Sequence, residues 1–456
     1  MPTSLLWFRR DLRLGDHPAL LAAVDDAGPD GNVLAVFVVD PALWRPAGEP
    51  RRQFLRDCLA ALQESLGGAL VLRSGDPSAV LPALVRGVGA SSVHVSADAG
   101  PYGRCRDAAV EQALGDVPLV RTGSPYAVTP GRLTTQEGTP FRVFSPFARA
   151  WRSHGWRAPA PRPETVRWLL DVPSDALPPG QDLDGVRLPP AGEAAALAAW
   201  ERFRDDLLPG YPETRNLPAT NGTSRLSAYL KYGCLHPRTL LADLADEEEG
   251  TEAVRRFTDE LAWREFYADV VWHRPESTRE PLDPRTGAIE YDTGPEADAH
   301  FAAWAEGRTG YPIVDAGMRQ LLGEAYVHNR VRMIVASFLV KDLHLDWRRG
   351  ARHFLQHLVD GDLASNNHGW QWVAGTGTDA SPYYRVFNPT RQGRQFDPAG
   401  DYVRRWVPEL RDVATAHVHE PWTAPGGVPA GYPEPVVEHA VERQVALARY
   451  QEVRSS

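Results

Sequence analysis

The side chains with the clearest capacity for ligand chemistry lie between residues 360 and 372. This stretch combines two aspartates, two adjacent asparagines and two tryptophans. Carboxylates and amides are costly to bury unless each finds a hydrogen-bond partner or a ligand. Asp362 precedes an apolar residue and also fits an ordinary helix N-cap, which is the commoner explanation for a single aspartate. A cap does not explain the amides and the indoles, so we interpret the stretch as a binding site.

The two tryptophan side chains of this stretch should point toward different surroundings. If residues 363–373 form a helix, positions two apart lie on different faces. We therefore expect one of Trp370 and Trp372 to face the interior and the other to face a cleft.

A second group of polar and aromatic side chains falls on one predicted helix, residues 257–270. Glu260, Trp263, Arg264 and Tyr267 stand at i, i+3, i+4 and i+7, so they share a face. A carboxylate, an indole, a guanidinium and a phenol in one stripe can hold a flat polar ligand. The alternative is a surface ion pair between Glu260 and Arg264 beside two half-buried rings.

The run from Thr223 to Ser227 is a weaker signal. It opens a predicted helix at 224–232, and hydroxyls with unpaired backbone N–H groups at a helix start can hold a phosphate. A plain Ser/Thr N-cap is commoner for such a pattern.

The segment His328 to Met333 is also weak by itself. Asn329 and Met333 share a helix face, Arg332 leans the same way, and we expect Arg330 to point elsewhere. An amphipathic helix with snorkelling arginines is the alternative.

The elements that must position these residues change along the chain. Residues 1–125 alternate short β-rich runs with amphipathic patterns, which predicts a doubly wound, Rossmann-like parallel sheet. Such sheets bind ligands beyond the carboxyl ends of their strands, and no GxGxxG turn favours a dinucleotide there. The predicted strands are 4–8, 33–40, 69–74, 92–97 and 118–121; the predicted helices are 17–26, 51–66, 78–88 and 104–114; the carboxyl ends lie at 7–13, 40–44 and 96–106.

Residues 126–195 are rich in proline and glycine, and we expect an extended connector. Residues 196–456 have helical periodicity and no evident strand, which predicts an all-helical domain. An acidic run at 246–249 is most simply a solvated turn. The predicted helices are 194–208, 224–232, 237–246, 252–273, 298–306, 312–341, 347–359, 363–373 and 433–450.

The composition bounds function and compartment. A net charge of −10 argues against a strongly basic nucleic-acid binder, but residues 211–240 and 321–410 carry more Lys and Arg than Asp and Glu. The cysteines, Cys58, Cys105 and Cys234, are scattered, which argues against disulfides or a thiolate metal site. No basic leader or long apolar run is present, so we expect a cytoplasmic protein that contacts no membrane. The fourteen tryptophans suit packing, base stacking or electron transfer.

Five motifs, in their order and spacing, resemble the photolyase/cryptochrome flavoproteins over nearly the whole chain. The resemblance implies an α/β antenna domain, a connector and an all-helical domain that binds FAD, in agreement with the pattern of elements. The motifs are Trp7-Phe-Arg-Arg-Asp-Leu-Arg13, Glu260-Leu-Ala-Trp-Arg-Glu-Phe-Tyr267, Gly310-Tyr-Pro-Ile-Val-Asp-Ala-Gly-Met318, His328-Asn-Arg-Val-Arg-Met333 and the stretch from Asp360 to Trp372.

The resemblance implies roles for polar residues of the helical domain. Arg332 should pair with Asp360 beside the flavin, Asp362 should accept a hydrogen bond from the isoalloxazine ring, and Asn366 should face its N5 atom. Other residues should hold the phosphates and the ribityl chain. The implied FAD-binding set is Tyr211, Thr223, Ser224, Arg225, Leu226, Ser227, Arg332, Asp360, Gly361, Asp362 and Asn366.

The implied substrate is UV-damaged DNA, with the damaged site flipped out of the duplex. A (6-4) photolyase would carry two histidines around Asn329 and Met333, so similarity to class I cyclobutane pyrimidine dimer photolyases is favoured. Excited FADH⁻ would give one electron to the dimer and recover it after ring opening, while Glu260 supplies a carboxyl hydrogen bond. The implied DNA contacts are Arg215, Glu260, Trp263, Arg264, Tyr267, Asn329, Arg330, Met333 and Trp372, with Arg385 and Arg391 as further phosphate contacts.

The resemblance also implies a photoreduction chain of three aromatic rings. Trp370 fits the ring next to the flavin and Trp347 the middle ring. The third position has no tryptophan, so we expect either Tyr291 or another exposed ring, such as Trp304, to be the terminal donor. His368 replaces a usual glycine, and nothing in the sequence explains it.

A second, light-harvesting chromophore is implied for the α/β domain. The Tyr-Gly-Arg at 102–104 is more similar to relatives that bind 8-hydroxy-5-deazaflavin than to those that bind methenyltetrahydrofolate, and binding neither is an alternative.

We expect a monomeric DNA-repair enzyme. The alternative function is a cryptochrome-like blue-light receptor without repair activity. Asn366 suits repair better, and we expect no long extension after the last predicted helix.

Overall fold

The computed structural model describes residues 1–245, 251–378 and 384–455, so the predicted acidic turn at 246–249 lies outside the described residues. The chain forms two compact units. Unit 1 comprises Met1–Asp182, Pro189–Pro209 and Ser224–Pro275, and unit 2 comprises Leu183–Leu188, Gly210–Thr223 and Glu276–Ser456. The predicted domains, 1–125, 126–195 and 196–456, follow the change in secondary structure, whereas these units follow contacts. That division into domains stays a prediction.

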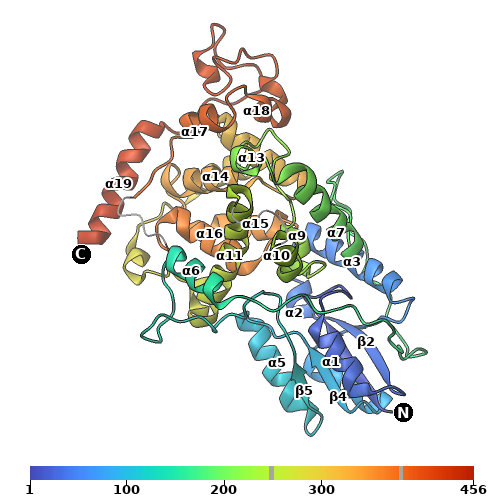
Figure 1. Ribbon diagram of the computed structural model, residues 1–456. Coiled ribbons are helices and arrows are strands. Elements are labelled where there is room, and N and C mark those ends of the chain that lie inside the picture. The colour runs from blue at the N-terminus through green and yellow to red at the C-terminus, as the bar shows by residue number, and fades with distance from the viewer. Residues whose placement is uncertain (246–250, 379–383, 456) are drawn as a thin grey trace. The chain divides into compact units, whose positions relative to one another are not determined.

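Unit 1 contains a parallel five-stranded sheet in the order β3-β2-β1-β4-β5 (Figure 1). All five predicted strands are confirmed. Their apolar residues are buried on both faces, as parallel sheets require. The strands are β1 Thr3–Phe8, β2 Asn32–Val39, β3 Val71–Ser74, β4 Ser92–Val95 and β5 Leu119–Arg121.

Helices cover this sheet as the alternating pattern predicts. α1 lies beside the sheet (Figure 1) and packs against β1, β2 and β4. α4 and α5 join a core cluster with Leu5 and Trp7 of β1. The helices of this part are α1 Pro18–Ala27, α2 Pro41–Trp44, α3 Glu49–Ser65, α4 Pro77–Val88 and α5 Pro101–Leu114.

The predicted connector contains a helix that its proline content did not indicate. α6 spans Phe144–His154 and packs against α11, burying Phe147 and Trp151. The expectation of a wholly extended connector is therefore wrong for this segment. The remaining helices of unit 1 are α7 Glu193–Arg202, a π-helical turn at Phe203–Leu207, α9 Ser227–Tyr232, α10 Pro237–Ala245 and α11 Glu252–His273.

The described residues of unit 2 form helices joined by loops, and none of them forms a strand. The single helix predicted at 312–341 is two helices, because Ala325 adopts a left-handed conformation (φ 50°) and ends the first. Its α-helices are α8 Tyr211–Thr214, α12 Pro295–Ala305, α13 Pro312–Glu324, α14 Asn329–Lys341, α15 Trp347–His357, α16 Leu363–Ala374, α17 Pro389–Phe396, α18 Asp401–Trp406 and α19 His439–Ser455; its 3₁₀ turns are η2 Pro275–Thr278, which starts at the last residue of unit 1, η3 Pro284–Ala288, η4 Pro408–Leu410 and η5 Pro421–Thr423.

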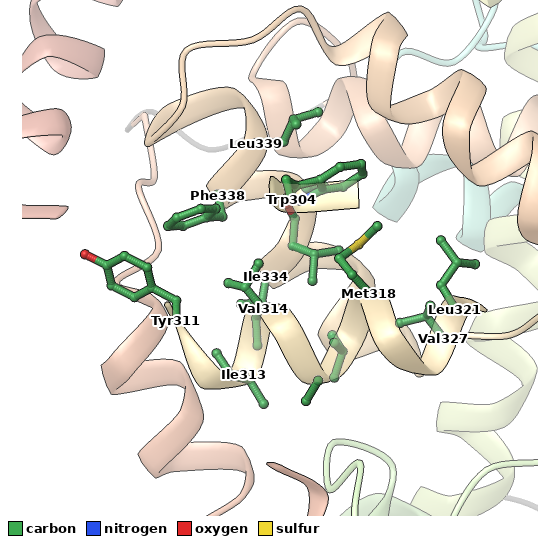
Figure 2. Packing of buried hydrophobic residues seen from close by; sticks show 14 of the residues in the cluster. Trp304, Tyr311, Ile313, Val314, Met318, Leu321, Val327, Ile334, Phe338 and Leu339 are labelled. Atoms are coloured by element: carbon green, nitrogen blue, oxygen red, sulfur yellow. The ribbon is translucent and has the colours of Figure 1, made fainter. Parts of the chain in front are cut away.

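The core of unit 2 is built around α13 and α14. Figure 2 shows Val314 and Met318 of α13 packed with Ile334 and Leu339 of α14, beside Trp304 of α12. All of these side chains are at most 1 % exposed. This core fixes the helices that carry the candidate site.

Among the described residues, no helix is both long enough and apolar enough to cross a membrane.

Candidate functional site

The start of α16 in unit 2 carries the predicted polar stretch. The Asp362 carboxylate accepts a hydrogen bond from the Ser365 backbone N–H at 3.1 Å, so Asp362 is the N-cap. The cap uses one carboxylate oxygen, and the side chain is half-buried. Capping and ligand binding by Asp362 are therefore compatible.

Arg332 of α14 and Asp360, just before α16, form the ion pair that the resemblance implied. Arg332 Nη2 lies 2.8 Å from Asp360 Oδ2, with side chains 26 % and 3 % exposed. Arg332 Nε also donates to the Val327 carbonyl at 2.7 Å. Burial pulls the pKa of Arg332 down, but the Asp360 carboxylate more than offsets this and the pKa is raised. The pair places a fixed charge couple beside the N-terminus of α16.

Asn366 lies one turn after Asp362. Its amide nitrogen donates to the Ala351 carbonyl at 3.1 Å and to Asn367 Oδ1 at 2.9 Å. The side chain is half-buried, and its oxygen accepts no hydrogen bond from the described residues. The oxygen is therefore the polar atom that Asn366 can offer to a ligand.

One face of α16 is incompletely covered by the chain. Asp362, Asn366, Gly369 and Trp372, spaced three or four apart, are all half-buried. A Cβ atom added at Gly369 would meet nothing within 4 Å. Trp370, by contrast, is 3 % exposed, so the predicted divergence of the two indoles is confirmed. This open stripe can accommodate a flat group.

The opposite face of α16 explains His368. His368 is fully buried, and its Nε2 lies 3.1 Å from Ser277 Oγ in η2. Burial lowers the pKa of His368 to about 4. Next to it, Gln371 Nε2 donates to the carbonyls of Ser277 and Glu280 at 2.6 and 3.0 Å. His368 therefore helps to hold η2 against the buried face of α16.

Trp370 and Trp304 lie close together in the core of unit 2, with ring centroids 6.0 Å apart and planes at 72°. Gly350 of α15 has room only for hydrogen beside Trp370, because a Cβ would lie 2.2 Å from that ring. Trp304 Nε1 donates to the Val335 carbonyl at 3.0 Å.

The expectation that Trp304 is an exposed ring is wrong. Trp304 is 0 % exposed, because it lies two turns after the buried Ala297 on the face of α12 that packs into the core. A fully buried ring makes no contact with a donor in solvent, so it is poorly placed to be the terminal donor. Trp347 is also buried, whereas Tyr291 is half-buried at the edge of the same core. Burial raises the pKa of Tyr291.

Asn329, Arg330 and Met333 lie at the start of α14. Asn329 is exposed and Met333 is half-buried. The expectation that Arg330 points away from Met333 is wrong, since its Nη1 lies 3.7 Å from Met333 Sδ. Its Nε and Nη2 donate to Asn216 Oδ1 at 3.2 and 2.9 Å. Burial lowers the pKa of Arg330.

Among the remaining predicted residues of unit 2, Tyr211 is buried at the start of α8, with the guanidinium of Arg215 5.3 Å from its ring. Thr223 is half-buried, Arg385 is exposed 6.0 Å from the Trp372 ring, and Arg391 is exposed in α17.

In unit 1, α11 presents the predicted stripe. Glu260, Trp263, Arg264 and Tyr267 are all half-buried, while their neighbours Leu261 and Ala262 are buried. Trp263 stacks on Phe144 with ring centroids 3.7 Å apart. The four side chains thus share one partly open face.

Arg264 does not form the alternative ion pair with Glu260. Its Nη1 and Nη2 donate to the carbonyls of Pro125 and Leu230 at 3.0 and 3.1 Å. The guanidinium also lies over the Tyr126 ring at 4.5 Å. Arg264 therefore ties α11 to two neighbouring segments of unit 1.

Sequence reasoning missed Glu265, on the other side of α11. This buried carboxylate accepts hydrogen bonds from the backbone N–H groups of Ala127 and Val128 at 2.5 and 3.0 Å and from Trp151 Nε1 at 2.6 Å. Burial raises the pKa of Glu265 despite these donors. An acidic residue on the apolar side of an amphipathic helix was the available signal.

The predicted helix at 224–232 begins only at Ser227. Arg225 has φ of 50°, and Ser224 Oγ accepts from the Leu226 N–H at 3.5 Å. The expectation of a helix start at Thr223 to Ser227 is thus wrong in position, because the left-handed Arg225 prevents an earlier turn. At the other end, Gly233 approaches the Arg10 carbonyl so closely that a Cβ would lie 1.9 Å from it.

The carboxyl edge of the sheet in unit 1 gathers charged side chains from two of the predicted loops. Arg9 pairs with Asp107 at 2.5 Å, Arg106 pairs with Asp98 at 3.2 Å, and Asp11 accepts from Ser96 Oγ at 2.6 Å. They lie where the strand order reverses between β1 and β4, the usual ligand position of such sheets. In the remaining predicted loop, residues 40–44, the Asp40 carboxylate accepts a hydrogen bond from the Tyr102 hydroxyl.

Comparison with known proteins gives a consistent result over the whole chain. Residues 4–164 match the family described as DNA photolyase, and residues 257–452 match the FAD binding domain of DNA photolyase. The deoxyribodipyrimidine photo-lyase of Halobacterium salinarum is 41 % identical, with 99 % of each chain covered. That of Escherichia coli is 40 % identical, with 100 % of this chain and 99 % of the relative covered.

Solved structures give the same picture. A bacterial class III photolyase from Agrobacterium tumefaciens has a TM-score of 0.93 at 39 % identity, covering 100 % of this chain and 98 % of that one. An archaeal photolyase from Sulfolobus tokodaii with two FAD molecules has a TM-score of 0.84 at 29 % identity, and the match covers 99 % of this chain and 100 % of that one. A cryptochrome from Synechocystis has a TM-score of 0.89 at 27 % identity, and the match covers 98 % of this chain and 99 % of that one. The predicted fold class, an α/β sheet part followed by helices, is confirmed.

Proposed function

The chain belongs to the DNA photolyase family, and we propose that it splits cyclobutane pyrimidine dimers in UV-damaged DNA under blue light. The observation that carries this proposal is the open polar face of α16, with the Arg332–Asp360 ion pair at its start. Full-length relatives with about 40 % identity are named deoxyribodipyrimidine photo-lyase, which supports the same activity. Assignment to class I stays a prediction.

The residues around α16 fit a flavin. An isoalloxazine ring has a polar edge of N–H and C=O groups and an apolar edge, so it needs acceptors, a cation and a flat surface. Asp362 and the Asn366 oxygen are acceptors, Arg332 is the cation, and Gly369 leaves open space on the same helix. The FAD-binding domain match to residues 257–452 includes all four.

The chain's contribution is binding and orientation, while bound FAD supplies light-driven one-electron transfer. The ion pair with Asp360 holds the Arg332 guanidinium in place, and the pair compensates the charge of the buried Asp360 carboxylate. Asp362 and Asn366 orient the ring, and Gly361 directly precedes Asp362 in the chain. Within unit 2, Tyr211 and Thr223 hold the phosphates and the ribityl chain, and the role of Ser224 to Ser227 in unit 1 stays a prediction.

Substrate contacts are proposed in each unit separately. In unit 2, the exposed Asn329 and the half-buried Met333 and Trp372 contact the flipped dimer. In unit 1, Glu260 can supply a carboxyl hydrogen bond to a base, and Trp263 offers an aromatic face. The guanidinium groups of Arg215, Arg385 and Arg391 bind DNA phosphates, since they are half-buried or exposed.

The buried Trp370 and Trp347 relay electrons during photoreduction, and Tyr291 is the terminal donor. The half-buried position of Tyr291, compared with the buried Trp304, favours this route. When Tyr291 gives up an electron, its phenol proton must pass to solvent, and its partial exposure permits this.

A second chromophore is proposed for unit 1, with 8-hydroxy-5-deazaflavin favoured over methenyltetrahydrofolate. The support is Tyr102, 40 % exposed at the carboxyl edge of the sheet. A second FAD is the further option, because the Sulfolobus tokodaii photolyase has two FAD molecules, which imply a novel light-harvesting cofactor in that protein. The absorption spectrum of the purified protein distinguishes these chromophores.

We also expect a monomer in the reducing cytoplasm. The three cysteines are free, and Cys58 and Cys234 remain thiols although their sulfurs are 3.5 Å apart. Size-exclusion chromatography with light scattering tests the oligomeric state.

The cryptochrome alternative is tested together with repair. The reduced protein is mixed with UV-irradiated oligothymidine and illuminated with blue light, and recovery of the thymine absorbance band is followed. The proposal expects recovery in light and none in darkness. Binding of FAD without any recovery would favour a receptor instead.

A further inference from the structure

Behind the open face of α16, two side-chain amides are locked by backbone carbonyls. We propose that Asn367 is a positioning residue: anchored on the Thr278 carbonyl, it holds Asn366 so that the Asn366 side-chain oxygen is presented to the flavin. The proposal rests on the proposed function, because it assumes that a flavin lies on this face of α16.

The orientation of both amides follows from what their partners can accept. Asn367 Nδ2 lies 2.6 Å from the Thr278 carbonyl, which can only accept a hydrogen bond. The atom of Asn367 that meets Asn366 must therefore be its oxygen, and the atom of Asn366 facing it must be the nitrogen. The Ala351 carbonyl, 3.1 Å from the same nitrogen, is a second acceptor that agrees with this orientation.

This arrangement uses both amide hydrogens of Asn366. One is donated to Asn367 Oδ1 and the other to Ala351 O, so Asn366 has only an acceptor left. A reduced flavin carries a hydrogen on N5, whereas an oxidised flavin has an unprotonated N5 that accepts. An Asn366 locked as an acceptor therefore favours the reduced flavin, the form that donates an electron to the dimer.

The anchor is itself held in place. Asn367 is 7 % exposed. The turn η2, which carries Thr278, is held against α16 by the His368–Ser277 contact and by Gln371. Gln371 Oε1 also accepts from the Leu282 N–H at 2.8 Å. Rotation of Asn367 would break its bond to Thr278, so Asn366 cannot flip without a cost at this second position.

The test is a double-mutant cycle with Asn367→Leu, Asn366→Ala and the two combined. The readout is the midpoint potential of bound FAD, measured spectroelectrochemically, together with FAD content per protein. N367L removes the anchor at similar volume while leaving Asn366 in place. We expect N367L to bind reduced flavin with about a tenfold weaker preference over oxidised flavin. This corresponds to a midpoint potential about 30 mV lower for a two-electron couple. Since Asn367 acts through Asn366, adding N367L to N366A should shift the potential no further.

An unchanged potential in N367L, or a shift that adds fully to that of N366A, would overturn the proposal. If N367L does not fold, Asn367→Ser gives the smaller perturbation, with the same expected direction. Wild-type protein that binds FAD but repairs no dimer would contradict the proposed repair activity and leave the cycle readable. Wild-type protein that binds no FAD would overturn both.

Discussion

At the scale of single residues, the site combines a paired charge couple with polar side chains on a partly open helix face. Arg332 and Asp360 are paired, whereas the carboxylate of Asp362 and the oxygen of Asn366 face the less covered side of α16. The Arg332–Asp360 pair joins residues far apart in sequence, so no spacing rule could predict it, and it was expected only from the resemblance. The role of His368 became visible only with its contact to Ser277.

The role of Glu260 gives a first prediction. Glu260→Ala should lower the repair rate by about 10- to 100-fold, because a hydrogen bond to a charged group is worth about 1.5–3 kcal/mol, while FAD content stays unchanged. Repair kinetics on UV-irradiated oligothymidine measure the effect. Glu252→Ala, exposed on the same helix, is the matched control. Loss of FAD in E260A would mean that α11 supports the cofactor rather than the substrate.

Trp370 gives a second prediction. Trp370→Phe should reduce the rate of flavin photoreduction at least about tenfold, since phenylalanine is much harder to oxidise, while chemically reduced enzyme still repairs. Time-resolved absorbance in the presence of an external reductant measures this rate. Trp406→Phe, in α18, serves as the control. Photoreduction at the wild-type rate in W370F would show that electrons take another route.

At the scale of elements, α11 is held by its buried carboxylate as well as by its apolar residues. Glu265 accepts three hydrogen bonds from the 127–128 backbone and from Trp151 of α6. These bonds bring the end of the β5 loop and a helix of the connector to α11. The orientation of the Glu260 stripe depends on them.

A third prediction concerns this anchor. Glu265→Gln replaces one acceptor oxygen by a donor that faces N–H groups, so the free energy of unfolding should fall by about 2 kcal/mol. Asp259→Asn, on the same helix, breaks only a partly exposed pair with Arg152 and should cost less than about 1 kcal/mol. Urea denaturation of the two variants provides the comparison. Equal losses would mean that the buried bonds do not stabilise α11 specifically.

Elements bounded by clear signals could be predicted from the sequence. α11 was predicted at 252–273 and spans Glu252–His273, with the Thr251 hydroxyl as its cap. The break between α13 and α14 could not be predicted, because apolar periodicity continues through it and an alanine, not a glycine, adopts the left-handed conformation. α6 was missed because prolines on either side dominated the pattern. Burial of Trp304 depends on packing between helices, which single-helix periodicity does not specify.

At the scale of the whole molecule, buried neutral histidines make stability depend on pH. Burial lowers the pKa of His17, His236 and His368 to about 4. The folded pKa values lie below the unfolded value of about 6.5, so their contribution is fully present above that value and is lost as pH falls. Burial also raises the pKa of Asp342 to about 6, which opposes this trend mainly below pH 6.

A fourth prediction follows from these histidines. Between pH 7.5 and pH 6.0 each should remove about 0.8 kcal/mol from the free energy of unfolding, as protons bind the unfolded chain. The three together remove about 2 kcal/mol, and His368→Asn should show a fall smaller by about 0.8 kcal/mol. Denaturant titrations at the two pH values measure both quantities. A stability that is flat or rises on acidification would contradict the assignment of these histidines as neutral.

The claim that the molecule is a light-driven repair enzyme for one class of lesion has a direct test. Two oligonucleotides, one with a single cyclobutane thymine dimer and one with a single (6-4) product, are incubated with reduced protein under blue light and in darkness. The products are separated by chromatography. Unmodified thymines should return only from the cyclobutane dimer and only in light. Return from the (6-4) product alone, or from neither lesion while FAD is bound, would contradict the account.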